Sequence, residues 1–152
     1  MTAKEYLRQL RSLDILINAM QLEKERMWAM ATRVNAPLND CKVDTSPDNS
    51  KNAELIIKVA ALQDEINKQV DDYVDLRTTI IRQISEIEDM RYRTILTMRY
   101  IDRQSFQEIA EQMKYNLRWV KRLHGWALQE FEKINNLAPL GHQKPPVKCG
   151  IV

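Results

Sequence analysis

Glycine is nearly absent from this chain, which holds only three glycines among 152 residues, all beyond position 124. A β-rich fold needs glycine in its tight turns, so the shortage favours helices. Leu, Ile, Met, Ala, Glu, Lys, Gln and Arg recur throughout, and charged residues make up 29% of the sequence. The composition therefore predicts an all-α protein with an extensive solvated surface.

Cysteines and long apolar runs are also scarce. Cys41 and Cys149 lie in predicted loops with no Cys or His at metal-ligand spacing, so we expect free thiols in a reducing compartment. No run approaches the roughly 18 apolar residues that span a bilayer. The first residues also lack the apolar core of a signal peptide. We therefore expect a cytoplasmic protein that has no membrane partner.

Residue patterns typical of enzymes are missing as well. The chain has two histidines, no glycine-rich phosphate loop and no Ser/His/Asp or Cys/His arrangement within one element. Asp71, Asp72 and Asp75 cluster on one predicted helix, where a solvated face accounts for them. The sequence thus predicts no catalytic residue, no bound metal and no cofactor.

The net charge of +2 conceals an uneven distribution. Residues 54–90 hold four basic and nine acidic residues, a balance of −5, whereas residues 91–134 hold nine basic and five acidic residues, a balance of +4. Such asymmetry is typical of a chain in which one part binds nucleic acid.

Residues 1–88 are predicted to form a long antiparallel coiled-coil hairpin. A first helix over about 2–34 carries an apolar stripe with alternating spacings of four and three residues, and a second over about 53–88 repeats the pattern. In the second helix, Gln69 and Gln83 occupy two stripe positions. Pro37, Pro47 and polar clusters predict a flexible loop over 35–52. Because the apolar stripes cannot stay in water, we expect a hairpin that also dimerises, closed either within one chain or between chains.

Residues 89–134 are predicted to form a module of three short helices, followed by a disordered tail over 135–152. Asp89 is the expected N-cap of the first helix, which runs to about Tyr100. Ser105 and Glu108 form a capping box for the second helix. Asn116 is the expected N-cap of the third, which runs to about residue 134.

The segment from 105 to 128 has the dimensions of a helix-turn-helix, with the third helix as the DNA-reading helix. Its outward basic residues, Arg118, Lys121 and Arg122, can bind guanine edges or phosphates. Gly125 costs about 1 kcal/mol relative to Ala within a helix, so it suggests close approach to DNA or to a neighbouring helix.

Several side chains of this segment have plainer interpretations. Trp119 and Trp126, seven residues apart on one face, are as readily explained by packing against the hairpin or a partner as by DNA contact. Tyr115 is interpreted as a core residue, and His124 as a packed histidine beside the apolar stripe.

The C-terminal module resembles region 4 of bacterial sigma factors. The resemblance is carried by YRTILTMRY at 92–100, SFQEIA at 105–110 and the reading helix up to Leu128. YNLRWV at 115–120 and LHGWAL at 123–128 are also similar to phage and prophage proteins of Gram-positive bacteria, the ArpU-type late-gene regulators. These motifs are confined to 91–131, although the likeness extends over 4–134.

The resemblance implies contacts with double-stranded DNA. The matching positions lie at the start of the second helix and at the start of the reading helix. They are Ser105 and Gln107 in the former, and Asn116, Leu117, Arg118, Lys121 and Arg122 in the latter. Trp119 and Trp126 depart from the family pattern, which has polar or basic residues there. No segment resembles sigma region 2, so the resemblance implies an accessory transcription regulator or a partner that docks on host RNA polymerase.

Two other functions fit the same pattern. Small terminase subunits, which are phage DNA-packaging adaptors, also combine a helix-turn-helix with coiled-coil helices, but they assemble as rings. A protein-binding module that has lost DNA affinity would explain the two tryptophans. Mass in solution and burial of the tryptophans would separate these alternatives from a homodimeric regulator.

Overall fold

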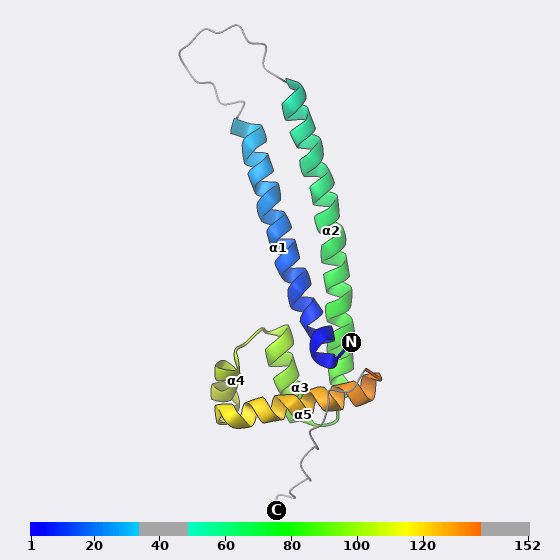
Figure 1. The fold of residues 1–152 in the computed structure, drawn as a ribbon, viewed down its shortest axis with the longest axis vertical. Helices are drawn as coiled ribbons and strands as arrows, with labels where there is room; N and C mark the ends of the chain where they lie inside the picture. The colour runs from blue at the N-terminus through cyan, green and yellow to red at the C-terminus, as the bar shows by residue number, and fades with distance from the viewer. Residues whose placement is uncertain (34–48, 138–152) are drawn as a thin grey trace, which may run out of the picture. The chain divides into compact units, whose positions relative to one another are not determined.

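The described residues of the computed structural model, 1–33 and 49–137, form helices joined by short turns, and no strand occurs among them (Figure 1). The prediction of an all-α protein is confirmed. In chain order the helical elements are α1 (Ala3–Arg33), α2 (Asn49–Ser85), α3 (Met90–Leu96), the π-helix η1 (Thr97–Ile101), α4 (Phe106–Met113) and α5 (Leu117–Asn135).

These elements divide into two compact units. One unit comprises Leu13–Tyr73, and the other joins Met1–Ser12 to the chain from Val74 onward. The first turns of α1 and the last turns of α2 thus belong to the same unit as the C-terminal helices. The sequence, in contrast, predicts that these turns are part of the hairpin. The predicted loop and tail, including both cysteines, lie largely outside the described residues.

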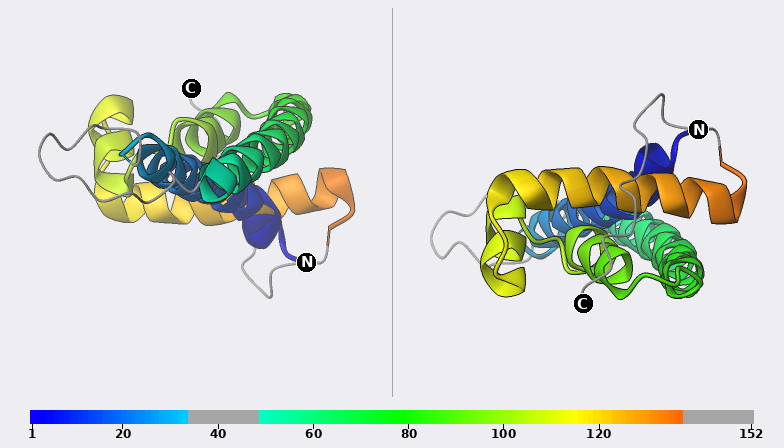
Figure 2. Two further views of the ribbon diagram at one scale, coloured as in Figure 1. Left: turned by 90° about the horizontal axis from the view of Figure 1, so that it is seen from above. Right: turned by 90° about the horizontal axis from the view of Figure 1, so that it is seen from below.

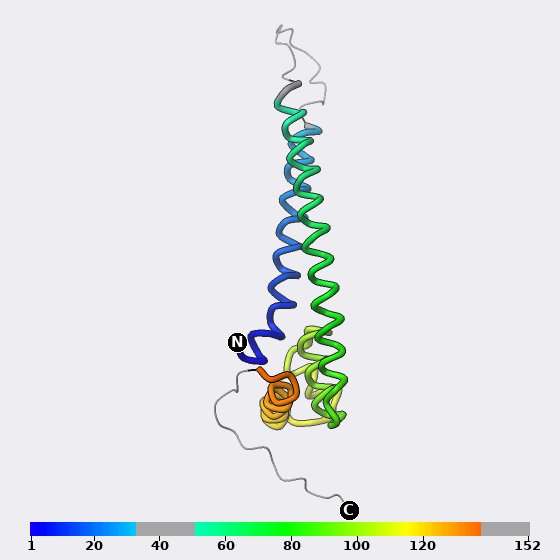
Figure 3. The backbone as a smooth tube through the Cα atoms, turned by 90° about the vertical axis from the view of Figure 1, so that its right-hand side faces the viewer, coloured from blue at the N-terminus to red at the C-terminus, as the bar shows by residue number. Residues whose placement is uncertain are grey.

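Within the unit Leu13–Tyr73, α1 and α2 lie side by side (Figures 1 and 3). Lys24 Nζ donates a hydrogen bond to Gln63 Oε1 at 2.8 Å, and Ile17 and Ile66 are buried. The prediction that the loop extends to residue 52 is wrong, because α2 begins at Asn49. Asn52 of this helix is buried, although Asn has a low intrinsic helix propensity.

In the other unit, the start of α1 is held against α5. The backbone N–H of Ala3 donates to Glu132 Oε1 at 3.0 Å, and the carboxylate is buried. The Tyr6 ring stacks on Phe131 with centroids 6.2 Å apart, and its hydroxyl donates to Gln83 Oε1 near the end of α2 at 3.0 Å. This hydrogen bond explains how a polar residue, Gln83, is accommodated in the apolar stripe of α2.

The end of α2 leads through a tight turn into α3. The prediction that α2 continues to residue 88 is wrong: it ends at Ser85, and Ile87 N–H turns back to the Ile84 carbonyl at 3.2 Å. This turn buries both Ile84 and Ile87. Burial of these two side chains accounts for ending the helix there.

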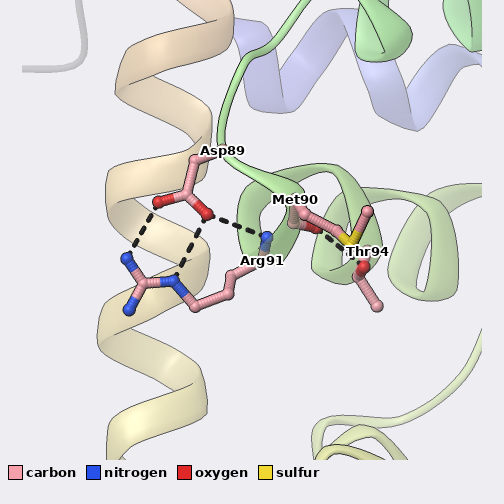
Figure 4. A network of polar contacts seen from close by, with 4 residues as sticks. All are labelled: Asp89, Met90, Arg91 and Thr94. Carbon is pink, nitrogen blue, oxygen red and sulfur yellow. Dashed lines mark hydrogen bonds and ion pairs between the residues drawn. The ribbon is translucent and has the colours of Figure 1, made fainter. Parts of the chain in front are cut away.

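Asp89 caps α3 as predicted (Figure 4). Its carboxylate accepts hydrogen bonds from the Arg91 backbone N–H at 2.9 Å and from Arg91 Nη2 at 2.9 Å. The hydrogen bond from the Arg91 side chain is the main cause that lowers the pKa of the Asp89 carboxyl. Thr94 Oγ1 donates to the Met90 carbonyl at 2.7 Å, one turn along the helix.

The predicted α-helix up to Tyr100 is correct only as far as Leu96. Beyond it the chain widens into η1, where Asp102 N–H donates to the Thr97 carbonyl at 3.0 Å. This segment positions Tyr100 to hydrogen-bond with His124 of α5. π-helical turns are rare and occur mostly as single-turn bulges in α-helices.

Candidate nucleic-acid interface

A short turn joins α4 to α5 (Figure 2). Each of the two helices begins with a capping hydrogen bond. At the start of α4, Ser105 Oγ accepts from Glu108 N–H at 3.2 Å, and Glu108 Oε2 accepts from Ser105 N–H at 2.6 Å. At the start of α5, Asn116 Oδ1 accepts from Trp119 N–H at 2.8 Å. The predicted capping box and N-cap are therefore confirmed.

The turn itself depends on a left-handed residue. Lys114 has φ 55° and closes α4, while Tyr115 N–H donates to the Ala110 carbonyl at 2.9 Å. A positive φ is uncommon for a residue that has a Cβ, and it commonly marks the end of a helix. The chain can thus change direction within three residues, so that α4 lies across the start of α5 (Figure 2).

The inner face of α5 is apolar, as predicted. The predicted inward residues are all buried: Val120, Leu123, Ala127, Leu128 and Phe131. Ile109 and Ala110 of α4 are buried as well, and the small Ala110 side chain permits a close crossing of the two helices. This packing fixes which face of α5 points outward.

A partly buried cluster of rings, in which His124 is the buried member, packs against the middle of α5. His124 Nε2 lies 3.1 Å from Tyr100 Oη, and the Phe106 ring meets the His124 ring edge-on with centroids 5.1 Å apart. Burial is the main cause that lowers the pKa of His124 to about 4, and it also raises the pKa of Tyr100 to about 12. His124 is therefore a neutral packed side chain at pH 7, in agreement with its interpretation.

All seven predicted DNA-contacting residues are exposed: Ser105, Gln107, Asn116, Leu117, Arg118, Lys121 and Arg122. They lie on α4, on α5 and at their N-caps. Two of them also have a structural role, because Ser105 and Asn116 cap the helices. Among the described residues, no ion pair engages the three basic side chains.

The positive charge of this surface is concentrated on α5 and the turn before it. From Lys114 to Gln129 the sequence has four basic residues and no acidic one. The start of α4 differs, because hydrogen bonds from the Ser105 backbone and then its side chain lower the pKa of the exposed Glu108 carboxyl. A negative charge beside Ser105 disfavours a phosphate there, so anionic ligands are expected to favour α5.

Three aromatic side chains lie in and after the turn between α4 and α5. The prediction that Tyr115 is a core residue is wrong, since its side chain is 37% exposed. Its place in the turn after Lys114 carries it out of the core. Trp119 and Trp126 are half-buried and pack edge-on against each other, with ring centroids 5.3 Å apart.

The chain is thus an all-α protein in which one face of the capped helix α5 is buried in a core and the other face carries exposed basic residues. A family model matches residues 34–130, which is more than half of the sequence. The chain belongs to this family, described as a protein of unknown function (DUF1492). No curated protein and no solved structure gives a significant match to the chain.

None of the helices in the described part of the chain combines the length and the apolar character needed to cross a membrane.

Proposed function

We propose that this chain is a sequence-specific, double-stranded DNA-binding transcription regulator of phage or prophage origin, with α5 as its reading helix. The observation that carries the proposal is the exposed basic face of α5. Arg118, Lys121 and Arg122 project from it, while the opposite face is locked into the core. The resemblance to sigma region 4 supports the same assignment.

The dimensions of α5 suit the major groove. A helix with its side chains is about 10–12 Å across, and the groove is about 12 Å wide. Arg118 lies in the first turn of α5, where reading helices contact base edges. Lys121 and Arg122 follow one turn later and can bind either guanine or phosphate oxygens.

The proposed partner in solution is a second copy, bound through the N-terminal helices. Several large apolar side chains of the unit Leu13–Tyr73 remain exposed: Ile15, Leu16, Leu22, Trp28, Met30, Ile56 and Ile57. Exposed apolar residues in such numbers are typical of a protein interaction surface. A dimer would present two reading helices to half-sites spaced by about 34 Å or a multiple of it.

Host RNA polymerase is a further candidate partner for the N-terminal helices. The acidic balance of residues 54–90 opposes contact with DNA, since like charges repel. In this proposal the acidic helix contributes to protein contacts, either in the dimer or with polymerase.

A protein-binding module remains the second candidate function. The half-buried Trp119–Trp126 pair favours it, because Trp is enriched where protein partners bind. A module of this kind would show no duplex affinity, and a Trp126→Ala variant would lose binding to its protein partner. A packaging adaptor would instead show a ring of many copies by mass in solution.

The proposal is tested by the salt dependence of binding to a short mixed-sequence duplex. We expect log K to fall linearly with log salt. In an Arg118→Ala/Lys121→Ala/Arg122→Ala variant, the slope should shrink by about 0.9 for each phosphate that the protein no longer neutralises. Lys58→Ala/Lys68→Ala/Arg77→Ala on α2 removes the same charge and is the matched control. Equal slopes for the two variants would contradict the assignment of α5.

A further inference from the structure

Gly125 lies inside α5, where nothing in the described chain requires a glycine. Its backbone is ordinary right-handed helix, since its φ is not positive. A Cβ built at this position would meet no atom within 4 Å. Close approach to a neighbouring helix, one of the two explanations drawn from the sequence, is therefore absent among the described residues.

A glycine in this position carries a cost. In the interior of a helix, glycine is less favourable than alanine, because it leaves more backbone entropy to be lost on folding. The open space around Gly125 means that alanine could be accommodated without strain. The advantage of a missing side chain must therefore concern something that approaches α5 from outside the described chain.

The residues around Gly125 on the helix surface are basic, and this charge indicates what kind of molecule approaches there. Residues three, four and seven positions earlier on a helix share its face, and here these are Arg122, Lys121 and Arg118. All three are exposed, and no acidic residue lies between Lys114 and Gln129. A surface with this charge favours a polyanion over an ordinary protein helix.

The spacing along the helix fits the edge of a DNA groove. Seven residues at about 1.5 Å each separate Arg118 from Gly125 by about 10 Å, close to the roughly 12 Å width of the major groove. When Arg118 reaches base edges, Gly125 lies where the sugar-phosphate backbone borders the groove.

We infer that Gly125 is a close-approach position at which the sugar-phosphate backbone of the duplex rests directly on α5. The missing side chain lets Lys121 and Arg122 reach phosphates next to the contact. This inference rests on the proposed DNA-binding function and adds a positioning residue to it.

The test adds side chains of increasing size at this position. Gly125→Ala and Gly125→Leu both place a good helix former at a position where a Cβ meets no other atom, so we expect Tm to rise by about 2–6 °C. We expect duplex affinity to fall by about tenfold for Gly125→Ala and by about a hundredfold for Gly125→Leu. The slope of log K against log salt should shrink by about 1–2, because fewer phosphates are then neutralised by the protein.

The matched control is Ala61→Leu, which adds bulk at an exposed position of α2. It should leave duplex affinity unchanged. Greater stability together with weaker binding is the expected signature for Gly125, because a purely structural glycine would not move the salt slope.

The outcomes separate this inference from the proposed function. If the wild-type protein binds duplex and the triple basic variant does not, while Gly125→Leu binds normally, the inference fails and the DNA-binding function stands. If the wild-type protein shows no salt-dependent binding, both fail. If Gly125→Leu changes the mass in solution but not duplex affinity, Gly125 serves a protein contact and the inference is overturned.

Discussion

The two compact units bury their side chains to very different extents. The largest fully buried side chains, including Phe131, Leu7, Ile80 and Leu96, all belong to the unit that joins Met1–Ser12 to the chain from Val74 onward. In the described part of Leu13–Tyr73, the buried apolar side chains are Ile17, Ala31 and Ile66, while Leu22, Trp28 and Ile57 are about half exposed or more.

One unit thus uses its apolar side chains to form a core, whereas the other leaves apolar side chains exposed for contacts with other molecules. The unit that contains α5 has a closed core, which holds α5 in a fixed orientation. Two helices side by side cannot enclose a core, so the other unit leaves much of its apolar surface exposed. The first unit therefore fits the role of a rigid DNA-binding module, and the second fits the role of a surface for partners.

The largest expected effect comes from the core around α5. Phe131→Ala should destabilise its unit by about 3–5 kcal/mol, because it removes a fully buried aromatic side chain and leaves a cavity. Ile17→Ala in the other unit should cost about 2 kcal/mol, at the lower end for such truncations. Urea denaturation followed by circular dichroism measures both. Equal costs would contradict the comparison.

The next effect is a pH dependence specific to the unit with the closed core. The pKa of His124 is lowered from 6.5 to about 4, mainly by burial, so below pH 6.5 the unfolded chain binds a proton that the folded chain does not. Stability from this group is fully present above pH 6.5 and is lost as pH falls toward 4, by about 3 kcal/mol.

A His124→Gln variant should lack this component of the pH dependence, which denaturation at a series of pH values would show. Leu13–Tyr73 contains no histidine, so its unfolding should not share it. If the variant and the wild-type protein lose stability in parallel between pH 6.5 and 4, the assignment to His124 is wrong.

Association should respond to changes in the other unit. Ile15→Lys/Leu22→Lys places charge on two exposed apolar positions of one helix face. Each substitution should weaken the free energy of association by about 1.5 kcal/mol or more, because an apolar side chain is no longer buried between the copies. The Kd of the dimer should therefore rise by about a hundredfold. Sedimentation equilibrium measures this. Gln21→Lys/Thr32→Lys adds the same charge at polar exposed positions and should leave the dimer intact. An unchanged mass for the first variant would rule out this face.

The smallest effect concerns the capping box of α4. Ser105→Ala should cost about 1 kcal/mol, because it removes the acceptor for the Glu108 N–H. Ser105→Asp keeps an N-cap acceptor and should retain stability, while its added negative charge weakens duplex binding. Thermal unfolding and duplex titration of the pair separate the cap from the DNA contact. Similar Tm values for the Ala and Asp variants would show that the cap contributes little.

Sequence reasoning succeeded where the signal is local. Asp89, Ser105 with Glu108, and Asn116 each cap a helix through residues no more than three positions away, and all were predictable. The inward face of α5 follows from helical spacing in the same way. The exposure of the basic residues on its other face is a direct consequence.

What escaped prediction depends on contacts between distant parts of the chain. The buried Glu132 carboxylate receives the Ala3 N–H, a pairing across 129 positions that no local pattern reveals. Asn52 is helical and buried where the sequence predicts a loop, and η1 departs from an α-helix where Tyr100 meets His124. The open space at Gly125 likewise required the positions of all neighbouring elements.

The most direct test of the central claim is selection from a random-sequence duplex library, followed by sequencing. The wild-type protein is selected in parallel with the Arg118→Ala/Lys121→Ala/Arg122→Ala variant. The account predicts an enriched motif that disappears in the variant, with half-site spacing that reports the dimer. No enrichment, with equally weak retention of both proteins, would contradict DNA reading by α5.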